Sequence, residues 1–222
     1  HAFGACALSW HPDGRRLAFV VQRFDELARL YISDLSGVKA VNVSGDWGFN
    51  DYPAWSPDGQ RLAFVSTGGV GDIPRLFVVN GDGAGLRRLS DVPVSFQPPA
   101  WSPDGTRLAF VAGDLRIIDL ATGDEVLRLN PLKGSYNNLA WSPDGATLAF
   151  TVFTGAEVGV YLLDVDGDNL RRLTPATLDV RRVNWSPDGT RLAVMAFAAD
   201  NSDIYLVDAA CGLSLDGLTA EV

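Results

Sequence analysis

Few side chains in this sequence have the types and the spacing that catalysis requires. Histidine occurs only at His1 and His11. A Ser-His-Asp triad needs a histidine held beside its serine, and His11 stands inside a turn motif, which nearly excludes such a triad. The sequence also lacks the Gly-x-Ser-x-Gly nucleophile elbow. We therefore expect no catalytic residue and no enzymatic activity.

Metal-binding patterns are equally sparse. The sequence contains no cluster of Cys and His that could bind zinc. An acidic run that begins at Asp164 resembles the start of a calcium loop, but Pro175 stands where the loop needs a bidentate Glu. We expect no metal site and no cofactor.

Polar positions that vary along the chain indicate recognition instead of catalysis. They lie four residues before a regularly spaced Trp and are Cys6, Asp51, Gln97, Asn137 and Arg181. The adjoining segments add Trp47, Phe49, Tyr52, Phe96, Tyr136 and Asn138. Polar groups beside aromatic side chains are typical of recognition surfaces. We predict that these residues, Cys6 excepted, bind a partner. The alternative is that the positions line a water-filled channel and are polar for that reason alone.

An internal repeat defines the elements that must position these residues. The motif Trp-Ser-Pro-Asp-Gly, with His in place of Ser in the first copy, begins at Trp10, Trp55, Trp101, Trp141 and Trp185. The Trp residues are separated by 45, 46, 40 and 44 residues. Each motif is followed by Leu-Ala-Phe or, in the last copy, Leu-Ala-Val. Repeats of this length indicate stacked supersecondary units.

Each residue of the motif suits a tight hairpin. Ser accepts a local hydrogen bond, Pro fixes φ at the second turn position, and Gly takes the left-handed conformation that ends the turn. The strand that ends in Trp must therefore pair with the strand that carries Leu-Ala-Phe. Arg follows the turn Asp at a fixed offset, and we expect ion pairs between Arg16, Arg61, Arg107 and Arg191 and the turn residues Asp13, Asp58, Asp104 and Asp188.

A second hairpin completes each repeat. Its first strand is apolar, as in 75–80, and its last strand is short and carries Arg pairs, as in 86–89. Arg pairs suit an exposed outer edge that must not recruit another strand. The sequence therefore predicts an all-β fold, a β-propeller of four-stranded antiparallel blades. We expect a single domain over 1–222 with blades at about 4–46, 47–92, 93–132, 133–176 and 177–222.

The string Trp-Ser-Pro-Asp-Gly-x-Arg-Leu-Ala-Phe, with Leu170-Arg-Arg-Leu-Thr174 as an example of the repeat's end, resembles the TolB-type, WD-like propeller repeat. That repeat occurs in the periplasmic TolB protein and in propeller domains of prolyl-oligopeptidase-like and tricorn-like proteases. The resemblance implies a periplasmic or otherwise extracytoplasmic bacterial protein, with a cytoplasmic location as the alternative. Propellers of this type usually have six or more blades. Two interpretations stay open: a five-bladed ring closed by face packing, or part of a longer propeller.

Composition limits the partners. The net charge of −9 argues against nucleic acid, which binds basic surfaces. The longest apolar stretch, 192–199, is too short to span a bilayer. Whether Cys6 and Cys211 form a disulfide is open, although the blade pattern places them on opposite faces.

Three functions are compatible with these observations. The first is a non-catalytic scaffold that binds a protein or peptide at the channel mouth, within a larger assembly. The second is the gating propeller of a prolyl-oligopeptidase-like serine peptidase whose hydrolase domain lies outside this sequence. The third is a binder of a small ligand or sugar at the channel mouth. Fold does not decide among them, because propellers have many unrelated functions.

Overall fold

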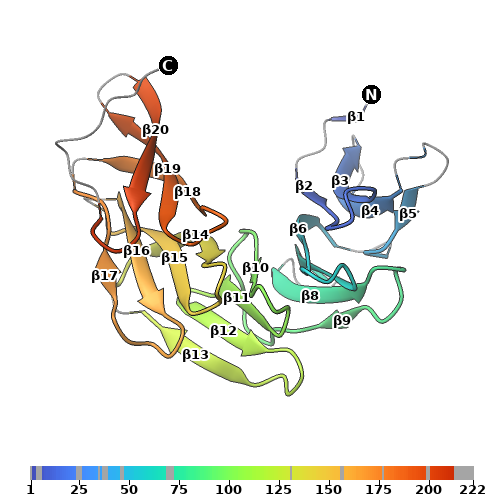
Figure 1. The fold of residues 1–222 in the computed structure, drawn as a ribbon. Helices are drawn as coiled ribbons and strands as arrows, with labels where there is room; N and C mark the ends of the chain where they lie inside the picture. The colour runs from blue at the N-terminus through green and yellow to red at the C-terminus, as the bar shows by residue number, and fades with distance from the viewer. Residues whose placement is uncertain are drawn as a thin grey trace. The chain divides into compact units, whose positions relative to one another are not determined.

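The computed structural model describes residues 2–3, 7–23, 27–34, 36, 40–45, 48–68, 73–130, 132–155, 158–176, 178–198 and 201–212. In this part of the chain all regular secondary structure is β, and the strands form five sheets (Figure 1). The predicted all-β class is confirmed. Neighbouring strands within a sheet are consecutive in sequence, apart from the short strand β1, which makes each sheet an up-and-down meander.

The first two sheets follow one another along the chain. The first contains β1 (Ala2–Phe3), β2 (Leu8–Trp10), β3 (Leu17–Arg23), β4 (Arg29–Ser33) and β5 (Ala40–Asn42). The second contains β6 (Asn50–Trp55), β7 (Arg61–Ser66), β8 (Arg75–Asn80) and β9 (Arg87–Arg88). In both sheets the strand that ends in Trp pairs antiparallel with the strand that follows the turn, as the motif predicts.

The remaining three sheets repeat this plan. The third contains β10 (Ala100–Trp101), β11 (Arg107–Val111), β12 (Leu115–Asp119) and β13 (Glu125–Leu129). The fourth contains β14 (Ser135–Trp141), β15 (Thr147–Phe153), β16 (Val158–Asp164) and β17 (Arg171–Arg172). The fifth contains β18 (Asp179–Trp185), β19 (Arg191–Ala198) and β20 (Asn201–Asp208). An outer strand expected after residue 212 falls outside the described residues.

The Ser-Pro-Asp-Gly corner is held by a small set of hydrogen bonds. In the fourth sheet the Ser142 hydroxyl donates to Asp144 Oδ1 at 2.6 Å and accepts the Thr147 amide at 2.9 Å. The Gly145 amide donates to the Ser142 carbonyl at 2.9 Å, and Gly145 has φ 73°. A side chain at that φ is strained, which is why glycine ends the turn. The corners at Ser56, Ser102 and Ser186 have the same Ser-to-Asp hydrogen bond.

The expected pairing of the repeat Arg with the turn Asp holds only in part. Arg16 Nε lies 3.0 Å from Asp13 Oδ2. Arg61 instead donates to the Gly105 carbonyl of the next corner at 2.8 Å, and its guanidinium lies 5.1 Å from the Trp101 ring centroid. The Asp58 carboxylate is already occupied by the Ser56 hydroxyl and the Gln60 amide. The Arg61 side chain therefore bonds the next sheet instead of its own turn.

The chain divides into two compact units. The first comprises residues 1–112 and 118–124, and the second comprises residues 113–117 and 125–222. The prediction of one domain over 1–222 stays a prediction.

Within the first unit, sheets stack face to face. Leu30 of the first sheet and Phe64 of the second belong to one buried cluster. Val78, on the opposite face of the second sheet, clusters with Leu108 of the third. Complete burial of such a side chain contributes about 1.5–3 kcal/mol. The second sheet must therefore be apolar on both faces, as its sequence is.

Within the second unit, the fourth and fifth sheets pack on one another. Val160 and Leu162 of β16 lie in one buried cluster with Val194 and Val207 of the fifth sheet. The indole Nε1 of Trp185 donates to the Ala140 carbonyl of the fourth sheet at 3.0 Å. The equivalent bond in the first unit joins Trp101 Nε1 to the Ala54 carbonyl at 2.9 Å. Trp101 and Trp185 therefore each join one sheet to the preceding sheet, whereas the Nε1 of Trp55 is buried without a hydrogen-bond partner among the described residues.

The corner carboxylates make the stability of the fold sensitive to acid. Hydrogen bonds from the Ser186 hydroxyl and then the Thr190 amide lower the pKa of Asp188 from 3.8 to about 2. A lowered pKa stabilises the fold above the unfolded value, and this contribution is lost as the pH falls through the folded value. We expect the thermal midpoint to fall as the pH drops from about 4 to about 2. Asp188→Asn should show a smaller fall than wild type in melts followed by circular dichroism. An equal fall in both proteins would contradict the assignment.

Candidate functional site

The first strands of the second, fourth and fifth sheets are interrupted at positions that the sequence analysis singled out. The pairing of β6 with β7 shifts register between Asp51 and Ala54, and that of β14 with β15 shifts between Asn137 and Ala140. The strand β18 has a similar shift between Val180 and Arg182. Bulges of this kind redirect side chains and often lie beside binding sites. The three irregularities therefore give the predicted residues an orientation that a regular strand would not.

In the first unit the bulge holds Asp51 and Tyr52. Tyr52 has φ 54°, a left-handed conformation that is uncommon for a bulky residue, and its amide donates to its neighbour's carboxylate, Asp51 Oδ1, at 2.8 Å. Both side chains are half-buried. Burial raises the pKa of the Asp51 carboxyl, and burial together with the Asp51 charge raises the pKa of Tyr52. The pair presents a partly desolvated carboxylate beside a phenol.

An aromatic pair accompanies this bulge. The rings of Phe49 and Phe96 meet edge to face with centroids 5.9 Å apart. Phe49 is half-buried, whereas Phe96 has 41% of its surface exposed. Gln97 is half-buried, and its backbone N–H donates to the Ser95 carbonyl at 2.8 Å. The predicted residue Trp47 lies outside the described residues.

In the second unit, Asn138 links the innermost strands of two sheets. Its Nδ2 donates to the Arg181 carbonyl at 2.7 Å and to Thr151 Oγ1 at 3.1 Å. The Thr151 hydroxyl donates in turn to the Asn137 carbonyl at 3.2 Å. Asn138 has φ 52°, a conformation that Asn tolerates better than most residues. The bulge in β14 therefore aims an amide at the neighbouring sheet.

Arg181 is exposed in this region, whereas Asn137 is half-buried. Arg181 is exposed and forms an ion pair with Asp179 at 2.7 Å. Its guanidinium also lies 5.3 Å from the ring centroid of Phe197, a ring with 41% of its surface exposed. Asn137 Nδ2 donates to the Ser135 carbonyl at 3.1 Å. Together these groups offer a cation, an amide and an apolar ring to the solvent.

Tyr136, also predicted to contact a partner, has a different environment. Its side chain is only 1% exposed, and its ring packs 5.7 Å from that of Phe150. Its hydroxyl donates to Asn130 Oδ1 at 3.3 Å and accepts the Leu132 amide at 3.2 Å. The structure thus places Tyr136 in the core, where it fixes the loop before β14.

Sequence reasoning overlooked an ionic network in the second unit. Arg116 is buried and bonds Asp114 Oδ1 at 2.9 Å and Glu125 Oε2 at 2.7 Å. Arg128 contacts the other Asp114 oxygen at 2.6 Å. A signal was present in the repeat, because the residues equivalent to Arg116 in the other copies are Tyr31, Phe77, Tyr161 and Tyr205. The network is charge-balanced and internally bonded, so it substitutes for aromatic packing.

The chemistry that these regions support is recognition by hydrogen bonds, charge and aromatic contact. In the described part of the chain, no three His, Cys, Asp or Glu side chains gather in a group that could hold a metal ion. Nor does that part include a helix with the length and apolar character needed to cross a membrane.

Comparison with known proteins agrees with the repeat and the sheet pattern. A family model described as the TolB beta propeller domain matches residues 3–121 and 75–210. The chain belongs to this TolB β-propeller family. No curated protein matches its sequence.

Solved structures show how widely this fold is shared. TolB from Acinetobacter baumannii superimposes with a TM-score of 0.73 and 23% identity, over 90% of this chain and 52% of that one. An oligogalacturonate lyase in complex with manganese superimposes with a TM-score of 0.69 and 20% identity, over 90% of this chain and 61% of the lyase. A prolyl endopeptidase superimposes with a TM-score of 0.66 and 18% identity, over 96% of this chain and 36% of the endopeptidase. The propeller chain thus spans about half the length of that TolB.

The left-handed residue in β14 provides a test of the bulge. We expect Asn138→Gly to lower the free energy of unfolding by about 1 kcal/mol through lost hydrogen bonds. Asn138→Ala should cost about 1 kcal/mol more, because a Cβ is strained at positive φ. Urea unfolding of both variants measures the difference. Equal losses, or a larger loss for Gly, would contradict a strained bulge at this position.

Proposed function

We propose that this propeller is a non-catalytic interaction module that binds a protein or peptide partner through the bulged entries of its innermost strands. The observation that carries the proposal is that side chains of the repeated motif form hydrogen bonds within the fold. The indoles of Trp101 and Trp185 and the corner side chains of Ser142 and Asp144 bond within the fold. What varies between blades, and remains accessible, is the set of groups at the bulges.

The chemistry of these groups favours a polypeptide partner. Asp51 in the first unit suits ligand donors, and Arg181 in the second unit suits ligand acceptors. The exposed rings of Phe96 and Phe197 supply apolar contact area of the kind that dominates binding energy at interfaces. The first unit contributes Asp51, Tyr52, Phe49, Phe96 and Gln97, and the second contributes Asn137, Asn138 and Arg181.

A pair of charge deletions tests this assignment. Asp51→Ala combined with Arg181→Ala should weaken binding of a captured and identified partner by about 10-fold or more, since recognition groups are lost. The matched control is Arg88→Ala combined with Asp91→Ala. This pair also removes one positive and one negative charge, from an exposed ion pair between β9 and the residues that follow it. Titration calorimetry should show unchanged affinity for the control. A large drop in thermal midpoint with intact affinity in the first variant would contradict the proposal.

The propeller of a serine peptidase is the second candidate. It is favoured by the prolyl endopeptidase structure, which covers nearly all of this chain with about a third of its own length. Such a propeller would control access to a hydrolase domain. The complete reading frame tests this candidate, because it must encode a Gly-x-Ser-x-Gly elbow in an α/β-hydrolase segment.

We further propose an extracytoplasmic, bacterial location for the module. Support comes from the family to which the chain belongs and from its similarity to TolB. A small-ligand or sugar role remains the third hypothesis, and a thermal-shift screen with oligosaccharides addresses it.

A further inference from the structure

The second sheet holds a partly buried carboxylate that lacks a counter-ion. Asp51, at the bulge of β6, is half-buried, and burial raises the pKa of its carboxyl. In the described part of the chain, the Tyr52 amide donates to Asp51 Oδ1 at 2.8 Å and no cationic side chain pairs with this carboxylate. A charge withdrawn from water without a partner is unfavourable. The bulge therefore holds a group that a bound cation would stabilise.

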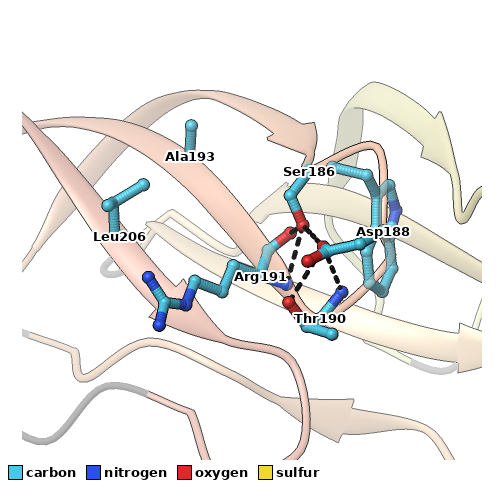
Figure 2. Close-up of a pocket in the computed structure, with 7 residues that line it drawn as sticks. Ser186, Asp188, Thr190, Arg191, Ala193 and Leu206 are labelled. Atoms are coloured by element: carbon cyan, nitrogen blue, oxygen red, sulfur yellow. Dashed lines mark hydrogen bonds between the residues drawn. The ribbon is translucent and has the colours of Figure 1, made fainter.

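Carboxylates elsewhere in the protein have their charge compensated. Figure 2 shows one of them, Asp188, which accepts hydrogen bonds from the Ser186 hydroxyl at 2.6 Å and the Thr190 amide at 3.0 Å. Asp114, whose side chain is only 13% exposed, is paired with Arg128 at 2.6 Å. The carboxylate at the bulge of β6 has one amide hydrogen bond and no such cation.

The arginines of the neighbouring strands are committed to other groups. The strands β7 and β8 carry one arginine each, Arg61 and Arg75. Arg61 donates to the Gly105 carbonyl at 2.8 Å, and Arg75 Nη1 donates to the Pro74 carbonyl at 3.2 Å. A counter-ion for Asp51 therefore has to come from beyond this part of the second sheet.

The bulge also fixes an aromatic ring beside the carboxylate. Burial, and then the charge of Asp51, raise the pKa of Tyr52, so the phenol lies within the field of that charge. Tyr52 has φ 54° and occupies the same repeat position as Asn138, which has φ 52°. A bulky residue keeps this costly conformation only where its surroundings impose it, and such residues cluster at ligand sites. A carboxylate beside an aromatic ring is a combination that binds organic cations.

We propose that Asp51 and Tyr52 form a binding site for an organic cation, a guanidinium or ammonium group presented by the partner. The carboxylate accepts charge-assisted hydrogen bonds from either group, and the ring adds cation–π attraction. This inference rests on the proposed interaction module and adds that the partner contacts Asp51 through an Arg or Lys side chain or a free N-terminal amine. Both residues of the site belong to the first unit.

Titration of the protein with small cations, followed by NMR, tests the site without the partner. The probes are n-butylguanidinium and n-butylammonium at constant ionic strength, with neutral n-butylurea as the control compound. The backbone N–H signal of Tyr52 reports directly, because this group bonds Asp51 Oδ1. We expect it to shift saturably with at least one cation and not with the urea. The cation that binds more tightly identifies the partner's group.

Three variants locate the binding. Asp51→Asn removes the charge but keeps an oxygen for the Tyr52 amide, and it should weaken cation binding by about 10-fold. Asp91→Asn is the matched control, since it removes the same charge from a side chain that is 90% exposed, and it should leave the affinity unchanged. Tyr52→Asn removes the ring and places at this bulge the residue that Asn138 supplies in β14, so it should weaken binding by about 3-fold.

A Tyr52 signal that neither cation moves, equal cation affinity of Asp51→Asn and wild type, or an equal response to n-butylurea would each overturn the proposal. This failure differs from failure of the interaction module. If the probes do not bind but the Asp51→Ala and Arg181→Ala pair weakens the captured partner, the cation site is wrong and the module stands. If the probes bind as expected but that pair leaves partner affinity intact, the cation site stands and the module is wrong.

Discussion

The burial of sheet faces between neighbouring sheets is the interaction on which the rest of this structure depends. Each repeat alone is a meander that would leave two apolar faces in contact with water. Stacking buries both faces, and the motif Trp adds a directional bond, seen from Trp101 to Ala54 and from Trp185 to Ala140. The repeat length, the apolar second strand and the charged outer strand all follow from this constraint.

The same constraint explains where variation is tolerated. Corner residues such as Ser142 and Asp144 are committed to hydrogen bonds that close the hairpin. The bulges of β6 and β14 interrupt strand pairing, so the side chains there point in directions that a regular strand would not allow. A propeller can therefore change its recognition surface without changing its core, which suits a family whose structural relatives include both TolB and enzymes.

Much of the fold could be predicted from the sequence, because local turn chemistry and pattern agree. The Pro-Asp-Gly corners, the hairpin pairing and the all-β class follow from residue types at fixed offsets. The bulges could not be predicted, since a one-residue register shift leaves no compositional trace at Asp51 or Asn137. The burial of Tyr136 could not be predicted either. Its hydroxyl hydrogen-bonds Asn130 and the Leu132 amide, and only the folded loop brings these groups close to it. The role of Arg61 was misassigned for a related reason: the Asp58 carboxylate is satisfied within its own turn.

The central claim is that Trp101 and Trp185 each join their own sheet to the sheet before it. Hydrogen exchange of the indole N–H groups, followed by NMR on dilute protein, tests this claim most directly. Trp101 and Trp185 should exchange slowly, because their Nε1–H groups donate to carbonyls of the preceding sheet, while the exposed Trp10 should exchange fast. Equal exchange of all three indoles would contradict the account.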